Sequence, residues 1–353
     1  MSAKFEFGCL PSAIGSMPHT NSSEACSIII KCLPDIPAWP QLPQRSPKEN
    51  MIIQFSEGFP GVVIDGDKIH IEPTTDFESE LEQIYINCEQ DNARKLRVWG
   101  QRPQCSYGIS AEYAAGLHAF LSKAAGSKIV KGQVTGPITW GLRVTTQDGL
   151  GILYDDTLAE TAAKFLRLKA SWQENILRQI SPKTIIFIDE PYLVSLGSVF
   201  TPIPEEKVPA LLEEVIKGIK GVKGLHCCGN TNWSVLLDTK IDILSFDAYY
   251  YASSMSTHAA KVKSFLEQGG SIAWGIVPNE EEALAKESLS GLRDRLEEAM
   301  APFTRDGVKF RQLIAQGLIT PSCGLKSLSP EAASQVLELT AKLSQDLRSR
   351  YAI

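Results

Sequence analysis

The sequence predicts a (β/α)8 TIM barrel, and three observations lead to this fold class. Short apolar segments alternate with polar or Gly-rich corners and amphipathic helical segments, an order typical of a parallel sheet. Seven such strands are recognisable, and an eighth is expected within the poorly periodic region 90–110. The chain has 353 residues, which is enough for one large barrel. A doubly wound open sheet is the alternative.

The expected strands are apolar runs that end at turn residues or polar side chains. They cover 10–15, 129–135, 184–189, 222–228, 242–247, 271–276 and 317–321. Helices are expected between them, at 22–33, 75–91, 110–124, 205–218, 287–302 and 330–348, and the clearest one places Leu158, Ala162, Phe165, Trp172 and Ile176 at helical spacing. Because no internal repeat is visible, residues 1–353 are predicted to form a single domain.

The segment 34–74 departs from this alternation. Its first half is too rich in proline for a helix, and residues 62–71 predict a hairpin that turns near Asp65 and Gly66. We expect an irregular Pro-rich and hairpin insertion after the first strand, on the face of the barrel where catalytic loops gather. A packing excursion without chemistry is an equally good interpretation.

Composition excludes several classes of partner. The 35 Lys and Arg residues against 41 Asp and Glu residues give a net charge of -6, without a long basic block, so no nucleic-acid partner is expected. No run approaches the roughly 20 apolar residues of a membrane span, and the first residues lack a secretory signal pattern, so we expect a cytoplasmic protein. The 8 cysteines are irregularly spaced and are expected to be reduced thiols, some of them metal ligands.

A candidate metal site begins at the end of the strand 222–228. Because side chains alternate along a strand, His226 and Cys228 are expected to point the same way, as half of a tetrahedral zinc site. In a barrel, Cys323 after the last strand reaches the same rim, and Asp247 ends the strand that follows 222–228. A histidine beside buried cysteines is also typical of an ordinary core, and Asp247 fits a helix cap equally well.

Five short blocks, spanning nearly the whole chain, resemble the catalytic barrel of cobalamin-independent methionine synthase and follow that family's order. They read AIGSMP at 13–18, VTGPIT at 134–139, IDEP at 188–191, HCC at 226–228 and PSCGLK at 321–326. The same blocks are similar to the related methylcobamide:thiol methyltransferases and, more distantly, to uroporphyrinogen decarboxylase.

The resemblance implies a zinc ion held by His226, Cys228 and Cys323. In that family a glutamate from the next strand commonly completes the site, and the matching position here is Asp247, which is one methylene shorter. Zinc coordination deprotonates an acceptor thiol, whose free pKa is about 8.5, and leaves it nucleophilic.

The resemblance also implies an amino-acid subsite. Groups at Ile14, Gly15 and Ser16 would bind the substrate carboxylate through exposed N–H groups, and Asp189 would bind the ammonium group as the catalytic acidic residue of the site. The alternatives are a tight turn into the helix 22–33 and a capped strand end at Asp189.

Two departures from the family bear on the methyl donor. The folate-using enzyme fuses two barrels, whereas this chain has room for one. It also carries a proton-donating histidine after the seventh strand, where residues 274–279 read WGIVPN. Methyltetrahydrofolate needs protonation at N5, but a cob(I)alamin leaving group needs no proton, so a methylcorrinoid is favoured, delivered in one variant by a corrinoid carrier protein. His19 is a candidate substitute acid.

The expected function is therefore a zinc-dependent S-methyltransferase that makes methionine from homocysteine and a methylcorrinoid, or methyltetrahydrofolate. Coenzyme M or another small thiol is the alternative acceptor. A uroporphyrinogen decarboxylase is a second possibility, although the stretch IGSMPHT at 14–20 lacks the arginines that a tetrapyrrole cleft needs. A barrel that binds corrinoid or zinc without catalysis is the third.

Overall fold

A seven-stranded parallel sheet forms the centre of the molecule. The computed structural model describes residues 6–66, 68–90, 107–198, 202–203 and 205–353. The strand order is β1-β10-β9-β8-β7-β6-β4. The bounds are β1 Leu10–Pro11, β4 Ile129–Thr135, β6 Lys183–Asp189, β7 Val222–Cys227, β8 Ile243–Phe246, β9 Ser271–Val277 and β10 Gly317–Pro321. All seven overlap expected strands, so the predicted parallel sheet is confirmed.

The sheet closes into a barrel through a short segment that lies between β1 and β4. Ser12, just after β1, pairs in parallel with Ile36, and Ala38 pairs in parallel with Lys131 of β4. Residues 36–38 therefore occupy the second strand position of a TIM barrel, and the fold class is confirmed.

This closure corrects one boundary drawn from the sequence. The insertion after the first strand is present, but it begins after residues 36–38 rather than at residue 34. Pro37 has no N–H group to donate, so the segment makes two isolated bridges instead of a full ladder. The eighth strand expected within 90–110 falls largely on residues 91–106, which lie outside the described residues.

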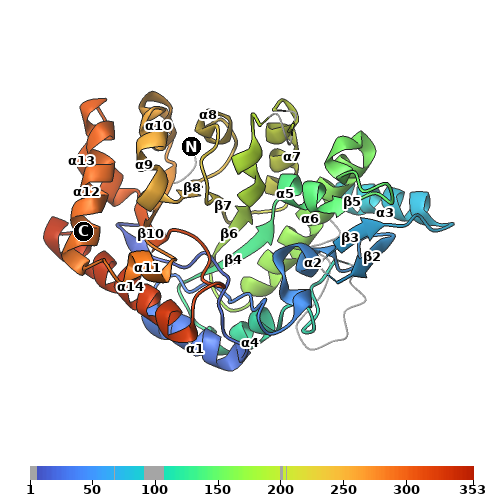
Figure 1. The fold of residues 1–353 in the computed structure, drawn as a ribbon, viewed down its shortest axis with the longest axis horizontal. Helices are drawn as coiled ribbons and strands as arrows, with labels where there is room; N and C mark the ends of the chain where they lie inside the picture. Colours follow the sequence, from blue (N-terminus) through green and yellow to red (C-terminus); the bar gives the residue numbers. More distant parts are fainter. Residues whose placement is uncertain (1–5, 67, 91–106, 199–201, 204) are drawn as a thin grey trace.

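Helices surround the strands (Figure 1). The longer ones are α1 Ser22–Cys32, α3 Phe77–Glu89, α4 Ala115–Lys123, α6 Asp156–Leu177, α7 Lys207–Ile216, α9 Ala248–Ser256, α10 Ala259–Glu267, α12 Leu289–Arg305 and α14 Pro330–Tyr351, and the shorter ones are α2 Met51–Ser56, α5 Pro137–Arg143, α8 Trp233–Leu237, α11 Glu281–Leu284 and α13 Phe310–Ala315. Side-chain caps explain several starts: Asp155 accepts from the Leu158 N–H, and Ser329 accepts from the Ala332 N–H. Within the described ranges, no helix has the length and apolarity to cross a membrane.

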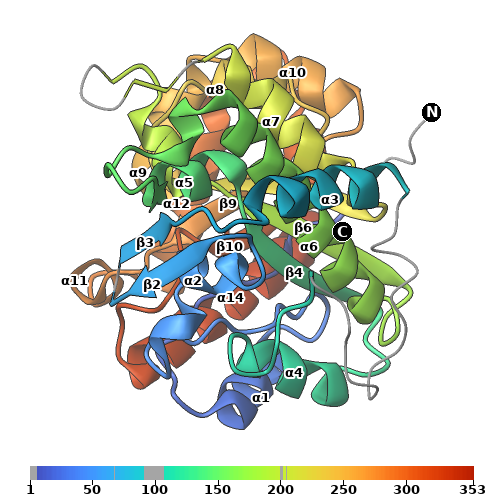
Figure 2. The same cartoon turned by 90° about the vertical axis from the view of Figure 1, so that its right-hand side faces the viewer.

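The predicted hairpin is confirmed. Strands β2 Val62–Asp65 and β3 Lys68–Ile71 pair antiparallel, and β3 continues in parallel onto β5 Val144–Thr145. Both views show the hairpin beside α2, within the segment that the sequence assigned to the insertion (Figures 1 and 2). A second small sheet thus lies next to the barrel.

The barrel interior has an apolar part followed by a polar layer. Eight buried apolar side chains form one cluster: Phe7, Ile36, Ile185, Phe187, Val222, Ile243, Ala273 and Leu318. Side chains two residues apart on a strand face the same side. The inward-facing series therefore continues to Asp189 on β6, His226 on β7 and Ser245 on β8. Polar side chains thus lie at the carboxyl ends of the strands, where TIM barrels have their active sites.

Candidate metal centre and substrate cavity

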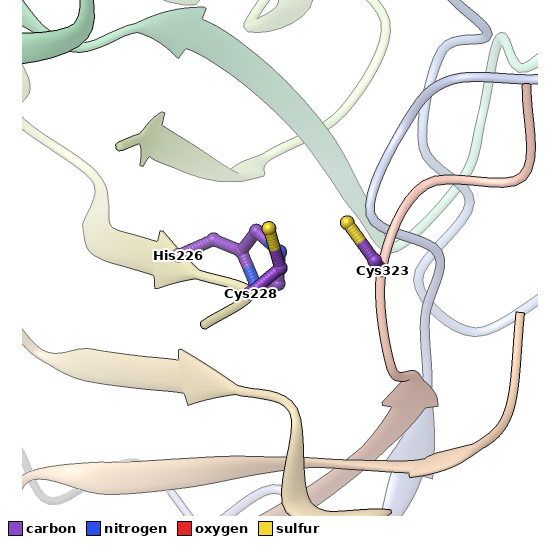
Figure 3. A group of neighbouring side chains, drawn as sticks. All are labelled: His226, Cys228 and Cys323. Carbon is purple, nitrogen blue, oxygen red and sulfur yellow. The ribbon is translucent and has the colours of Figure 1, made fainter. Parts of the chain in front are cut away.

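Three of the predicted metal ligands lie together. One imidazole nitrogen of His226 and the sulfur atoms of Cys228 and Cys323 all lie within 4.8 Å of one another. His226 is on β7, Cys228 follows that strand directly, and Cys323 is two residues beyond the end of β10. Figure 3 shows the two cysteines approaching the same space from opposite sides, with the imidazole next to Cys228. The barrel thus brings together residues that are almost 100 positions apart.

The imidazole of His226 has one ring nitrogen bonded to a neighbour and one without a partner in the described chain, an arrangement that fits a metal ligand. Its Nδ1 is 3.0 Å from the Ser245 hydroxyl, while its Nε2 is buried and has no hydrogen-bond partner in the described chain. A buried polar atom without a partner is costly, so this nitrogen indicates an absent ligand. Metal-binding histidines commonly bond their other nitrogen to a fixed partner, as His226 does to Ser245. A nitrogen with two sulfurs fits zinc and leaves a fourth tetrahedral position.

The two thiols favour holding one negative charge between them. A hydrogen bond from the Cys323 thiol, together with the neighbouring His226 ring, lowers the pKa of Cys228 against the opposing effect of burial. The same hydrogen bond and burial raise the pKa of Cys323. Cys228 is therefore a thiolate at neutral pH, which is the form that binds zinc.

Asp247 is not brought into this group. It precedes α9, where its carboxylate accepts a hydrogen bond from the Tyr250 N–H at 3.0 Å. Burial raises the pKa of Asp247 to about 7, against the lowering effect of the hydrogen bonds at the helix start. The structure thus shows the helix-cap role, and coordination of a metal by Asp247 remains a prediction.

A cavity of about 430 Å³ opens onto the three ligands. The residues that line it come from both ends of the chain, from the segment 34–74 and from the ends of central strands: Ile14, Ser16, Gln41, Pro43, Glu49, Asn50, Met51, Ile52, Thr139, Arg143, Asp189, Pro191, Tyr192, His226, Cys228, Cys323, Gly324 and Lys326. Six of them, from Gln41 to Ile52, belong to the segment 34–74, so this segment forms one wall of the cavity.

His19 is not among the residues that line the cavity. It is buried near Glu24 of α1 and Glu331 of α14, and burial lowers its pKa despite these two carboxylates. Its Nδ1 has no partner in the described chain. The role of His19 as an acid stays a prediction.

The turn Ile14-Gly15-Ser16 presents unused N–H groups. None of the three donates to an acceptor among the described residues, although Ile14 and Gly15 are buried. Gly15 has φ of +153°, and an added Cβ atom would lie 2.8 Å from the side chain of Gln133. The turn is fixed by Lys131, whose ammonium donates to the Ile14 carbonyl at 2.6 Å. Neighbouring N–H groups in one turn, without acceptors among the described residues, suit an anion.

Asp189 lies in the same cavity as an unpaired acceptor. Its Oδ1 is buried without a hydrogen-bond partner in the described chain. Burial raises the pKa of Asp189 to about 6, although Lys131 and His226 counteract part of this effect. The carboxyl is thus largely ionised at neutral pH and lacks a direct cationic partner. A ligand ammonium group would supply one.

The neighbouring Glu190 has a structural role instead. Its two carboxylate oxygens accept the N–H groups of Ile138 and Thr139 at 2.9 and 2.7 Å, which caps the first turn of α5. Burial raises the pKa of Glu190 to about 7, against these hydrogen bonds. The two adjacent acids therefore divide their roles, and only Asp189 faces the cavity.

Sequence reasoning missed several residues of the site. Lys131 supports the turn at residues 14–16, while Gln41 and Glu49 line the cavity. A single lysine inside the buried strand β4 is an unusual pattern and was available as a signal for Lys131. Gln41 and Glu49 lie in the Pro-rich segment, which has no periodicity from which their direction follows.

The fold and the site define a TIM barrel with a His-Cys-Cys group that could hold a metal ion at the carboxyl ends of its strands. No family model matches the chain, and no curated protein sequence does either. Solved structures do match: one is a B12-independent methionine synthase from Shewanella sp. W3-18-1 in complex with selenomethionine, with a TM-score of 0.60 at 16% identity, covering 97% of this chain and 98% of that one.

A second match is a putative vitamin-B12 independent methionine synthase from Listeria monocytogenes. Its TM-score is 0.57 at 16% identity, and the alignment covers 93% of this chain and 86% of that one. At such identities the likeness establishes a shared fold, over nearly the full length of both chains. The resemblance expected from the five sequence blocks is confirmed at this level.

Proposed function

We propose that this protein is a zinc-dependent S-methyltransferase of the methionine synthase type, with homocysteine as the acceptor. Two observations carry the proposal: one imidazole nitrogen of His226 lies within 4.8 Å of the Cys228 and Cys323 sulfurs, and the buried His226 Nε2 has no hydrogen-bond partner in the described chain. The fold shared with methionine synthases supports the same assignment.

His226, Cys228 and Cys323 would hold the zinc ion, with Ser245 fixing the imidazole. Bound zinc supplies a Lewis acid that keeps an acceptor thiol deprotonated at neutral pH without destroying its nucleophilicity. The fourth position, next to a cavity of about 430 Å³, is where a small thiol would enter.

The remaining groups of the cavity suit an amino acid. The N–H groups of Ile14, Gly15 and Ser16 would bind the carboxylate, and Asp189 would bind the ammonium group. Lys131 holds the turn through the Ile14 carbonyl. Together these contacts would orient the substrate and bring its sulfur toward the metal ligands, which lowers the entropic part of the barrier.

We propose a methylcorrinoid as the preferred donor, delivered by a corrinoid carrier protein, with methyltetrahydrofolate as the lesser alternative. During transfer the new S–C bond forms as the cobalt–carbon bond breaks, and the electron pair stays on cobalt, so no acid is required. Methyltetrahydrofolate would need a proton at N5. After β9 the chain has Asn279, whose amide is no acid at neutral pH.

The test is a methyl-transfer assay with zinc-loaded protein and homocysteine. We expect methionine to form from methylcobalamin and much more slowly from methyltetrahydrofolate, while Cys323→Ser is inactive with both. Absence of methionine with either donor would refute the function. Tight binding of cobalamin without turnover would instead indicate an accessory barrel, and carboxylate loss from uroporphyrinogen a decarboxylase.

A second assay separates the acceptors. Coenzyme M is a small thiol without an ammonium group, so Asp189 has nothing to bind in it. Asp189→Asn should therefore raise the KM for homocysteine and leave any reaction with coenzyme M unchanged. Faster transfer to coenzyme M than to homocysteine in the wild type would assign the other thiol as the acceptor.

A further inference from the structure

The loop that carries Cys323 is fastened by one residue of the neighbouring strand end, Asn279. The Asn279 amide donates to the Gly324 carbonyl at 3.1 Å, and its Oδ1 accepts from the Ser322 hydroxyl at 2.9 Å. The Asn279 N–H also donates to the Ser322 hydroxyl oxygen at 3.2 Å. One side chain thus binds both residues that flank Cys323.

Cys323 needs such support more than the other two ligands do. His226 is part of the paired strand β7 and Cys228 follows it directly, so the sheet fixes their positions. Cys323 lies beyond the last residue of β10, and the register of β10 against β9 already shifts between Thr320 and Pro321. The ladder does not determine where its sulfur lies.

The same loop is packed tightly against the turn at residues 14–16, which the proposed function assigns to the substrate carboxylate. The Leu325 N–H donates to the Ser16 carbonyl at 2.8 Å, and a Cβ atom added at Gly324 would lie 2.1 Å from the Ser16 hydroxyl oxygen. A displacement of Gly324 would therefore move Ser16 as well as Cys323. Asn279 therefore binds the loop that contacts both the metal group and the turn at residues 14–16.

We propose that Asn279 is a positioning residue for the metal centre, which sets the location of the Cys323 sulfur. This inference rests on the proposed function only in that zinc is the ion. An asparagine suits the task because it donates to one flank of Cys323 and accepts from the other. An aspartate lacks the donor and would place a negative oxygen against the Gly324 carbonyl.

The assignment also explains what this residue does in place of an acid. The resemblance leads one to expect a proton-donating histidine in this region, but the Asn279 side chain is committed on both sides to the Cys323 loop. It is therefore unavailable to a methyl donor. The position serves the acceptor side of the reaction instead.

The test is zinc affinity, measured by competition with a chromophoric chelator, in wild type, Asn279→Asp and Asn279→Leu. Partners that orient metal ligands typically contribute about ten- to hundredfold in affinity, so we expect a loss of that size in both variants. Asn232→Ala is the control, because Asn232 follows the other ligand strand and its side-chain amide donates to the exposed Glu205 carboxylate rather than to the metal group. It should bind zinc like the wild type.

Cobalt substitution gives a second readout that does not depend on activity. The thiolate-to-cobalt absorption band should weaken or shift in the Asn279 variants, while their melting temperatures without metal stay within a few degrees of wild type. Unchanged affinity and spectrum in variants that fold would overturn the positioning role and leave the zinc site intact. Failure of the wild type to bind zinc at all would overturn the proposed function together with it.

Discussion

Asp189 and His226 are direct partners in the parallel ladder between β6 and β7. Adjacent strands are about 4.8 Å apart, so the acid and the first metal ligand begin from neighbouring points at the same level of the barrel. The unpaired carboxylate oxygen of Asp189 therefore belongs to the strand position next to a candidate metal ligand. The proposed function uses this pairing, since the substrate's ammonium group would bind Asp189 while its sulfur enters the position beside His226.

Removal of Cys323 should abolish stable zinc binding. Wild-type protein purified without chelators is expected to contain about one zinc per chain, and Cys323→Ser much less, because two of three protein ligands do not retain the ion. Cys32→Ser is the matched control, since Cys32 ends α1 and is not in the metal-binding group. Metal analysis of the three proteins decides; equal zinc in all of them would contradict the assignment.

Gly15→Ala should destabilise the fold and impair substrate binding. The new methyl group meets Gln133 at 2.8 Å while the backbone stays at φ of +153°, and strain of this kind costs about 1–3 kcal/mol. Gly66→Ala is the control for backbone strain alone, since Gly66 has φ of +59° and no atom within 4 Å of the added Cβ. Thermal unfolding measures both.

A compensating change tests the cause of that loss. Gln133→Ala should restore part of the stability of Gly15→Ala by removing the contact. The double variant should lose less stability than the sum of the losses measured for the two single variants. If the losses simply add, packing against Gln133 is not the reason for the glycine.

The stability contributed by Glu190 should depend on pH. Burial raises its pKa to about 7 from an ordinary 4.5, so the folded chain holds this proton more tightly than the unfolded chain does. The contribution is fully present below about pH 4.5 and is lost as pH rises through about 7. Glu190→Gln has no such proton.

Urea unfolding of metal-free protein at pH 5 and pH 8 measures the effect. Relative to wild type, Glu190→Gln is expected to be more stable at pH 8 than at pH 5. Its free energy of unfolding minus that of the wild type should therefore be larger at pH 8. Taking the difference between the two proteins cancels the other titrating groups. A difference that stays constant with pH would show that Glu190 does not carry a raised pKa.

Adjacent cysteines should react very differently with iodoacetamide in metal-free protein. Burial raises the pKa of Cys227 to about 12, whereas the Cys323 thiol and His226 lower that of Cys228. Because the thiolate is the reactive form, alkylation at pH 7 should occur at Cys228 and spare Cys227.

Peptide mass spectrometry distinguishes the two sites, and added zinc should protect Cys228. Modification of Cys227 at a comparable rate would mean that the strand end opens readily. Modification of Cys228 unaffected by zinc would mean that the ion does not bind there.

Much of the barrel follows from the sequence alone. The apolar strands and the amphipathic helices between them predict a parallel sheet. The blocks around His226 and Cys323 lie at strand ends, where barrels place their functional residues. The wall segment 36–38 does not follow, because Pro37 and two isolated bridges leave no periodic signal. Tertiary pairing decides its place.

The site is less predictable than the fold because its polar contacts join distant parts of the chain. Asp247 follows a strand next to the ligands, yet its carboxylate accepts a hydrogen bond from the Tyr250 N–H and caps α9. Asn279 shows no motif at all, and its contacts to Ser322 and Gly324 exist only once β9 and β10 are adjacent. Local patterns identify a cysteine or a histidine as a candidate; they do not identify what holds it.

The two-bridge closure between β1 and β4 has a dynamic consequence. Strands β4 and β6 share seven registered pairs, so their amide hydrogens are expected to exchange with solvent only through large openings, whereas the seam at Ser12, Ile36 and Ala38 can part locally at lower cost. The seam adjoins the turn at Ile14. An amino acid bound at Ile14 would hold this seam closed, and deuterium uptake along the seam would then be slower.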